Sequence, residues 1–257
     1  MSSQKGDSRL RGAKGAGAKR RRLLTSVIFN IVFFCLLLSL LYTLRRLFFA
    51  PLSAPVWDER GKSDYLLSLL QCALGLLVLF LPSVLERRLF IALPDLISTL
   101  YFLFLFGAVF LGEVRSFYYR VPHFDVILHA LSGLMAGALG LSLAGLLNRG
   151  RRTAFQLSPG FIALVAFLFG CAVGLVWEIY EFTMDGLFGV NMQKTMLESG
   201  EILQGRAALF DTMKDLIADA LASLAMSLIG YFSLRGGGNL FKKLSVRFLP
   251  RAERSKE

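Results

Sequence analysis

The sequence predicts an all-α, polytopic membrane helical bundle with about six transmembrane helices, and with the N-terminus and C-terminus in the cytoplasm. Apolar residues make up 55% of the 257 residues, and 23 residues are Phe. The mean hydropathy is +0.58, which excludes an ordinary water-soluble domain. Six runs reach the roughly 20 largely apolar residues that a helix needs to cross a bilayer. Each run must be helical, because hydrocarbon offers no partner to an exposed backbone N–H or C=O group.

The expected spans are residues 23–44, 65–85, 95–112, 126–147, 160–182 and 212–234, of which the third is the shortest. They divide the chain into a disordered basic cytoplasmic tail (1–22), a three-span N-terminal part (23–120), a three-span core with the polar site (121–234) and a second basic cytoplasmic tail (235–257). Disorder is expected at the start of the chain because residues 1–19 are rich in Gly, Ser and Lys.

Lys and Arg residues determine the predicted orientation, because they gather on the cytoplasmic side of membrane proteins. Segments on the side of the two termini hold 20 of them, whereas the opposite segments hold eight. Arg45 and Arg46, at the outer end of the first span, are mild exceptions. We interpret the basic tails as orientation signals that contact anionic lipid heads, and we expect no nucleic-acid partner. The chain is therefore expected to be a multi-pass protein of the cell membrane.

The last three spans each carry a stripe of small and ionisable residues at every fourth position. The stripes are Asp125, His129, Gly133 and Gly137; Ala166, Gly170, Gly174 and Glu178; and Asp211, Asp215, Asp219, Ser223 and Ser227. Positions four apart lie on one side of a helix, and rows of small residues let two helices approach closely. Because successive spans alternate in direction, the ionisable ends are expected to meet around a polar pocket near the outer surface.

These ionisable residues are candidate site residues, because a charged group near the bilayer centre costs about 2.5–3.5 kcal/mol and usually has a function. The candidate metal ligands are Asp125, His129, Glu178, Asp211, Asp215 and Asp219, and the candidate catalytic acids are Glu178 and Glu181. Carboxylates with one imidazole suit Mg²⁺, Mn²⁺, Ca²⁺ or Zn²⁺, and such a cation would neutralise their mutual repulsion. Bound protons, or Lys214 and the outer arginines as counter-ions, would have the same effect.

Several candidates also have a purely structural interpretation. Asp125 and Asp211 lie where helix caps are expected, and His129 would then be a hydrogen-bonded core residue. Glu181 or Asp185 would form a plain salt bridge with one of the outer arginines. The sequence leaves these interpretations open beside the functional ones.

Four blocks of the sequence resemble a known family. They are "FDVILHALSG" (124–133), "WEIYEFTMD" (177–185), "FGVNMQ" (188–193) and "DTMKDLIADALASL" (211–224). In this order they resemble the YjdF-like family of uncharacterised bacterial integral membrane proteins, and they are more distantly similar to the VanZ-like proteins. The resemblance covers about residues 121–234 and implies a multi-span membrane protein in which the His and acidic positions recur. It implies no activity, although the association of VanZ with glycopeptide tolerance points to envelope lipids.

Three classes of function fit this sequence. The first is a metal-dependent enzyme that acts on an envelope lipid or a lipid-linked phosphate at the outer leaflet, with Glu178 or Glu181 as the general base. The second is a cation- or proton-coupled transporter, and the third is a non-catalytic membrane scaffold or sensor. The long connection at 186–210 is expected either to cover the pocket or to lie passively at the membrane surface.

Overall fold

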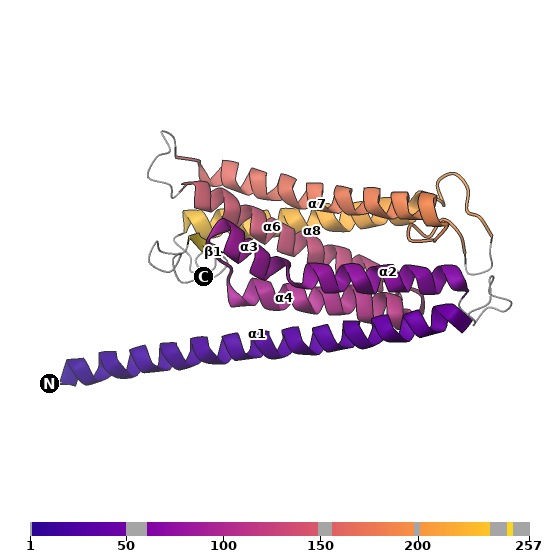
Figure 1. Cartoon of the computed structure of the whole chain (residues 1–257). Coiled ribbons are helices and arrows are strands. Elements are labelled where there is room, and N and C mark those ends of the chain that lie inside the picture. Colours follow the sequence, from indigo (N-terminus) through magenta and orange to yellow (C-terminus); the bar gives the residue numbers. More distant parts are fainter. Residues whose placement is uncertain (1, 50–60, 149–155, 198–200, 237–245, 249–257) are drawn as a thin grey trace.

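The computed structural model describes residues 2–49, 61–148, 156–197, 201–236 and 246–248. Six helical segments within these ranges are long and apolar enough to cross a membrane. They run side by side in an elongated bundle (Figure 1). The predicted all-α, multi-span membrane fold is therefore confirmed, whereas the side of the membrane on which each terminus lies stays a prediction.

The bundle consists of the helices α1 (Ser2–Phe49), α2 (Lys62–Leu79), α3 (Leu81–Leu89), α4 (Asp95–Leu105), α5 (Phe117–Arg120), α6 (Phe124–Asn148), α7 (Pro159–Phe188) and α8 (Phe210–Arg235), and the π-helix η1 (Phe106–Val114). Two short strands, β1 (Ile91–Ala92) and β2 (Arg247–Phe248), pair in antiparallel register. The second span is formed by α2 and α3 together, and the third by α4 and η1. Both composite spans therefore contain an interruption of the regular α-helix.

Local sequence signals explain where several helices begin and end. The hydroxyl of Ser158 accepts a hydrogen bond from the Phe161 N–H, and Pro159 follows it, as is common at the start of a helix. Gly189 ends α7 with a φ of 61°, a left-handed conformation that glycine adopts without strain. Pro82 lies in the first turn of α3 and lacks the N–H that a continuous α2–α3 helix would need.

The N-terminal segment lies in a long helix, while the expected division of the chain into tails, N-terminal part and core stays a prediction. Helix α1 begins at Ser2, so it includes residues 2–22, which the composition predicts to be disordered. The segment contains Ala, Lys and Arg, which are good helix formers, and it continues directly into the apolar part of α1. In the other tail, residues 237–245 and 249–257 lie outside the described residues.

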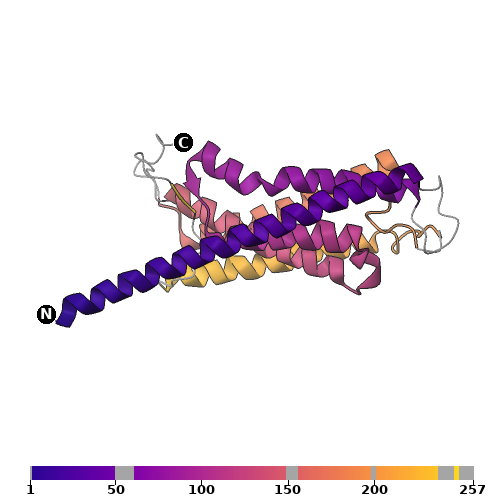
Figure 2. The ribbon, with the colours of Figure 1, turned by 60° about the horizontal axis from the view of Figure 1, so that its bottom comes forward.

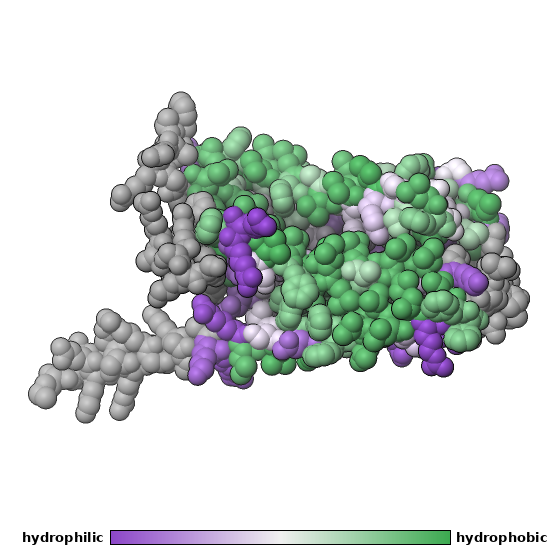
Figure 3. Space-filling model, in the orientation of Figure 1, coloured by the Kyte–Doolittle hydropathy of each residue, from purple (hydrophilic) through white to green (hydrophobic). Residues whose placement is uncertain are grey.

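The six spans form two packed groups. Helices α6, α7 and α8 pack closely on one another, and α1, α2 and α4 with η1 form the second group beside them (Figures 1 and 2). The core of the N-terminal group consists of Val32, Leu36, Cys72, Leu79, Phe102, Leu105 and Val109. Large apolar side chains also cover the outer face of the bundle between its two ends (Figure 3), as expected for a surface in contact with lipid.

Glycines set the close packing of α6 against α7. A Cβ atom at Gly140 would lie 2.9 Å from the Cα of Ala166 and 3.0 Å from the Cβ of Phe169. Because a backbone atom cannot move aside alone, the two helices would have to separate. We expect Gly140→Ala to lower the free energy of unfolding by about 1–3 kcal/mol, measured by thermal unfolding in detergent.

Gly186→Ala is the matched control for this prediction. Gly186 also lies within α7, but none of the described residues has an atom within 4 Å of an added Cβ. This substitution should leave stability unchanged or raise it slightly, because alanine favours the helix. A similar loss of stability in both variants would contradict the packing argument.

Candidate functional site

The candidate residues meet at one end of the three-helix core. Asp125 and His129 lie in the first two turns of α6, and Glu178 and Glu181 lie in the C-terminal part of α7. Asp211, Asp215 and Asp219 lie in the first turns of α8. Because α7 runs antiparallel to both neighbours, these positions gather at the end of the bundle opposite to the start of α1 (Figure 1). Under the predicted orientation this end is the outer one.

His129 is at the centre of this cluster. Its Nδ1 atom lies 2.8 Å from Oδ2 of Asp219, so a buried hydrogen bond joins α6 to α8. Its Nε2 atom lies 3.8 Å from Oδ1 of Asp125 and 3.9 Å from Oε1 of Glu178. Both distances exceed a hydrogen bond. The imidazole is therefore held at one nitrogen, and its other nitrogen faces two carboxylates across a gap.

Several buried carboxylate oxygens of the cluster lack a hydrogen-bond partner within the described part of the chain. They are both oxygens of Glu178, Oδ1 of Asp215 and Oδ1 of Asp219. The hydroxyl of Thr212 lies close to Glu178 but without hydrogen-bond geometry. Exposed fractions of 4% for Glu178, 1% for Asp215 and 2% for Asp219 leave little contact with solvent. Buried, unpaired carboxylates are costly, so this arrangement favours a further cationic partner.

Two lysines neutralise part of the negative charge. Lys194 contacts Oδ2 of Asp125 and lies 3.2 Å from Oδ2 of Asp211. Lys214 lies 2.6 Å from Oδ1 of Asp211 and 3.8 Å from Oδ1 of Asp215. Among the described residues, six carboxylates therefore face three basic groups. The carboxylates are those of Asp125, Glu178, Glu181, Asp211, Asp215 and Asp219, and the basic groups are those of His129, Lys194 and Lys214.

Lys194 reaches the cluster from the connection between α7 and α8. The carboxylate of Asp185 accepts hydrogen bonds from the backbone N–H groups of Met192 and Gln193, which fixes the chain just before Lys194. Lys194 itself has a φ of 50°, a left-handed conformation that costs a non-glycine residue on the order of 1 kcal/mol. This part of the connection therefore contacts the cluster through Lys194, whereas the role of the whole of 186–210 stays a prediction.

The charge state of Lys194 follows from its surroundings. Burial lowers its pKa, but the carboxylates of Asp125 and Asp211 raise it by more, so the pKa lies above the ordinary lysine value. The ring centre of Tyr118 is 5.9 Å from the Lys194 ammonium, and the pKa of Tyr118 is also shifted by its surroundings. Burial raises the pKa of Tyr118 well above its ordinary value, and the negative charge of Asp125 raises it further. A charged lysine therefore lies over a neutral phenol at the edge of the site.

Small residues allow the acidic groups to approach. A Cβ atom at Gly133 of α6 would lie 2.6 Å from the backbone oxygen of Asp219. A Cβ atom at Gly174 of α7 would lie 2.5–2.9 Å from side-chain atoms of Asp219. The backbone of Asp219 thus lies against Gly133, and its side chain occupies the space that Gly174 leaves free. The small-residue stripes and the acidic positions are parts of one packing arrangement.

The capping and salt-bridge interpretations of these residues can be compared with the contacts that they make. Asp211 makes no capping hydrogen bond at the start of α8 and instead contacts the two lysines. Glu181 accepts a hydrogen bond of 2.9 Å from the indole N–H of Trp177, and Asp185 holds the connection, so neither forms the expected ion pair with an arginine among the described residues. One alternative from the sequence has Lys214 as a counter-ion of the acids, and Lys214 does contact Asp211. The three outer arginines, Arg115, Arg120 and Arg206, are exposed.

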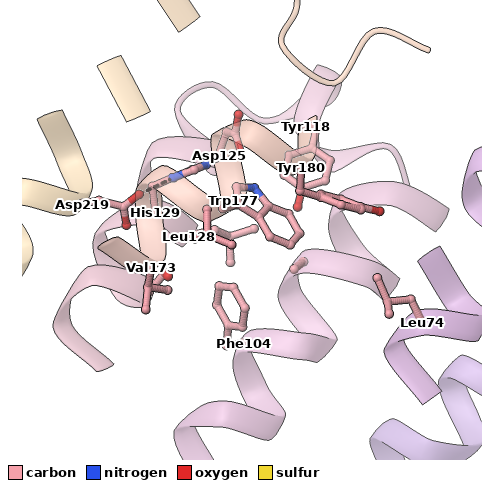
Figure 4. A pocket seen from close by; sticks show the side chains of 13 residues that line it. Leu74, Phe104, Tyr118, Asp125, Leu128, His129, Val173, Trp177, Tyr180 and Asp219 are labelled. Atoms are coloured by element: carbon pink, nitrogen blue, oxygen red, sulfur yellow. Dashed lines mark hydrogen bonds and ion pairs between the residues drawn. The ribbon is translucent and has the colours of Figure 1, made fainter. Parts of the chain in front are cut away.

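A chamber of about 370 Å³ extends from the cluster into the apolar part of the bundle. Figure 4 shows Asp125, His129 and Asp219 at one end, and Phe104 and Leu74 further from them. Tyr118, Trp177 and Tyr180 form an aromatic wall beside the polar end. The chamber therefore has one charged end and otherwise mainly apolar walls, supplied by both groups of helices.

Comparison with known proteins identifies the family. A family model described as "Predicted membrane protein (DUF2238)" matches residues 33–236. The chain belongs to this family. An uncharacterised protein from Thermotoga maritima is 33% identical over 134 residues, which is 50% of this chain and 60% of that protein. No solved structure matches the chain. The DUF2238 match extends beyond the 121–234 core to most of the N-terminal part.

Some residues of the DUF2238 site were not among the sequence-based candidates. Lys194 was counted only as one of the outer basic residues, yet it contacts two of the acids. The aromatic residues Tyr118, Trp177 and Tyr180 were also missed, although they line the chamber. The lysine lies in the connection for which covering the pocket is one of the two expectations, and this position is the available signal. Aromatic residues near a helix end carry no such signal, because they are common at membrane interfaces.

Proposed function

We propose that this protein is a divalent-cation-dependent enzyme that hydrolyses a lipid-linked phosphate at the outer membrane surface. The observation that supports it most strongly is the set of buried carboxylate oxygens without partners around His129. The resemblance to the YjdF-like proteins and, more distantly, to the VanZ-like proteins is part of this proposal.

The geometry around His129 fits a bound cation. One ligand atom each from Asp125, His129 and Asp215 lies within 4.8 Å of the others. Ligands of one Zn²⁺ or Mg²⁺ ion are roughly 3–4 Å apart, since each lies about 2.0–2.2 Å from the metal, so the three side chains would draw closer together around a bound ion. Asp219, hydrogen-bonded to Nδ1, would orient the imidazole so that Nε2 is free to bind, as the carboxylate partners of metal-binding histidines do. Glu178 would be a further ligand or lie beside the cation.

The described residues of the cluster supply carboxylates for the reaction, and none of them is a Ser, Thr or Cys. A bound cation would polarise a phosphoryl oxygen and activate water. Glu178 is the better placed of the two candidate bases, because neither of its oxygens has a hydrogen-bond partner among the described residues, whereas Glu181 accepts the Trp177 N–H. In the proposed reaction water attacks phosphorus, the bond from phosphorus to the lipid oxygen breaks, and the lipid oxygen takes up a proton. The products are a lipid alcohol and inorganic phosphate.

The part of the core beyond the acids favours an enzyme over a transporter. The hydroxyl of Ser223 donates to the backbone oxygen of Phe167 at 3.1 Å, and Ser227 donates to that of Ser223 at 2.8 Å. These hydroxyls are thus satisfied by helix backbones, and Gly137, Gly140 and Gly230 bring the helices into contact there. A closed inner half suits a pocket that is reached from one side.

Cation binding by the full-length purified protein in lipid nanodiscs tests the proposal. We expect one Mn²⁺ ion per chain by equilibrium dialysis and electron paramagnetic resonance. Asp215→Asn should weaken binding by more than about 100-fold, because a direct ligand matters more than the groups that orient ligands. Release of phosphate from phosphatidic acid and a polyprenyl phosphate should depend on the cation and should be lost in Glu178→Gln.

Asp95→Asn is the control variant, since it removes one carboxylate at the first turn of α4, away from the cluster. It should bind Mn²⁺ and release phosphate like the unaltered protein. The proposal is wrong if the unaltered protein binds no divalent cation, or if Glu178→Gln hydrolyses both substrates at the full rate.

A further inference from the structure

The chamber beside the cluster has the form of a site for a hydrocarbon chain. Its volume of about 370 Å³ lies within the roughly 300–1,000 Å³ of small-molecule sites. Apolar lining comes from four different elements, with Leu74 from α2, Phe104 from α4, Ala108 from η1 and Val173 from α7. Polar groups are concentrated at one end, where His129 and Asp219 are found.

The polar end of the chamber is buried, and one of its carboxylate oxygens lacks a hydrogen-bond partner among the described residues. Asp219 lines the chamber, is 2% exposed and has one oxygen, Oδ1, without a hydrogen-bond partner among the described residues. His129 lines the same end and is 5% exposed. Empty cavities in protein cores are lined by apolar groups, because a buried polar group without a partner costs free energy. The combination indicates a ligand with a polar head and an apolar body.

The exposure of the lining residues shows where such a ligand would enter. Leu74 is 39% exposed, Val173 is 37% exposed and Val176 is 65% exposed, although all three line the chamber. They lie on the sides of α2 and α7, within the spans rather than at their ends. The rim of the chamber is therefore at the side of the bundle, where the hydrocarbon of the bilayer would be.

Tyr118, Trp177 and Tyr180 form an aromatic wall of the chamber beside its polar end. The rings of Trp177 and Tyr180 are 5.2 Å apart, and the Trp177 N–H is bound by Glu181. Tyr118 completes the wall where Gly112 leaves room for its ring, since a Cβ at Gly112 would lie 2.5–2.6 Å from ring atoms. Tyr and Trp are preferred at the depth where lipid heads meet lipid chains. The wall is therefore at the level expected for a head-to-chain junction.

From these observations we infer that the chamber binds the hydrocarbon chain of a lipid-linked phosphate, which enters sideways from the bilayer between α2 and α7 with its phosphate toward His129. The inference rests on the proposed function for the identity of the head group. Because the polar end carries carboxylates, a phosphate would be repelled there unless a divalent cation lies between them. Binding of the chain in the chamber should thus depend on the cation when the head is a phosphate.

Photo-crosslinking tests this site directly. The probe is phosphatidic acid with a diazirine on one acyl chain, added to nanodiscs that contain the full-length protein and Mn²⁺. Labelled peptides, found by mass spectrometry, should come from α2 around Leu74 and from α7 around Val173 and Val176. We expect Ala108→Phe and Val176→Trp, which fill the chamber or its rim, to reduce this labelling at least about tenfold, since a plugged cavity cannot hold the chain. Chelation of Mn²⁺ should reduce it similarly.

Leu175→Trp is the matched control, because Leu175 is the neighbour of Val176, is 51% exposed and does not line the chamber. It should be labelled like the unaltered protein. Mn²⁺ binding without lipid is measured on the same variants and should be unchanged in Ala108→Phe and Val176→Trp, which also shows that they are folded. Full labelling in both filled variants overturns the chamber site while leaving the cation proposal intact. Labelling that resists chelation but is lost in the filled variants supports the chamber and contradicts the cation-bridged phosphate.

Discussion

Lys194→Met is expected to destabilise the cation-free protein by about 3 kcal/mol, because it leaves the partly buried carboxylates of Asp125 and Asp211 without their shared counter-ion. The raised pKa of Lys194 means that its ion pairs are fully present below the ordinary lysine pKa and are lost only as the pH rises through the higher value of the folded protein. The difference between the two proteins should therefore be constant between about pH 6 and 8. Thermal unfolding in detergent measures it.

A divalent cation should recover much of this loss. A ligand that binds only the folded protein stabilises it by about 2.7 kcal/mol at a concentration of 100 times its Kd. Without Lys194 the carboxylate of Asp125 is free of its competing ammonium, so Mn²⁺ should raise the unfolding temperature more in Lys194→Met than in the unaltered protein. Arg206→Met is the control, since Arg206 is an exposed cation of the same connection. Equal destabilisation by both substitutions would show that Lys194 has no special role.

Gly174→Ala is expected to weaken cation binding by about 10–100-fold, the usual effect of disturbing a group that orients a metal ligand. The added methyl group would occupy the position of the Asp219 carboxylate, whose atoms lie 2.5–2.9 Å from the ideal Cβ position. Asp219 would have to move away from Nδ1 of His129, and the imidazole would lose its fixed orientation. Mn²⁺ titration in detergent, followed by electron paramagnetic resonance, measures the change.

Gly170→Ala separates this effect from general overpacking. Gly170 lies one turn earlier on the same face of α7, and its added Cβ would collide with the side chain of Ser223 instead of Asp219. Both variants should lose stability, but only Gly174→Ala should lose affinity for the cation by a large factor. If the two variants bind Mn²⁺ equally, the contact between Gly174 and Asp219 does not position His129.

The sequence predicts the spans and the facing stripes because both depend on periodicity. Hydrophobic length locates a helix in a membrane, and four-residue spacing locates its packed face. Alternation of direction then brings the start of α6, the end of α7 and the start of α8 to one depth, where the structure places His129 within 4 Å of Asp125, Glu178 and Asp219. These relations follow from helix geometry alone.

Other features depend on contacts between distant parts of the chain, which periodicity does not encode. The position of Lys194 follows from two backbone hydrogen bonds to Asp185 and from a left-handed backbone conformation. The chamber is lined jointly by residues of α2, η1 and α7, and such a combination has no local signature in the sequence.

The pairing of β2 with β1 has a consequence for the electrical behaviour of a membrane that contains this protein. Val246, just before β2, is 1% exposed, and its N–H donates to the Ser142 hydroxyl of α6 at 2.5 Å. The chain near its C-terminus is thereby bound against the end of the three-helix core that lies farthest from the acidic cluster. A planar bilayer that contains the protein should keep its high resistance under an applied voltage, because ions that reach His129 would have to pass between the closely packed helices α6, α7 and α8.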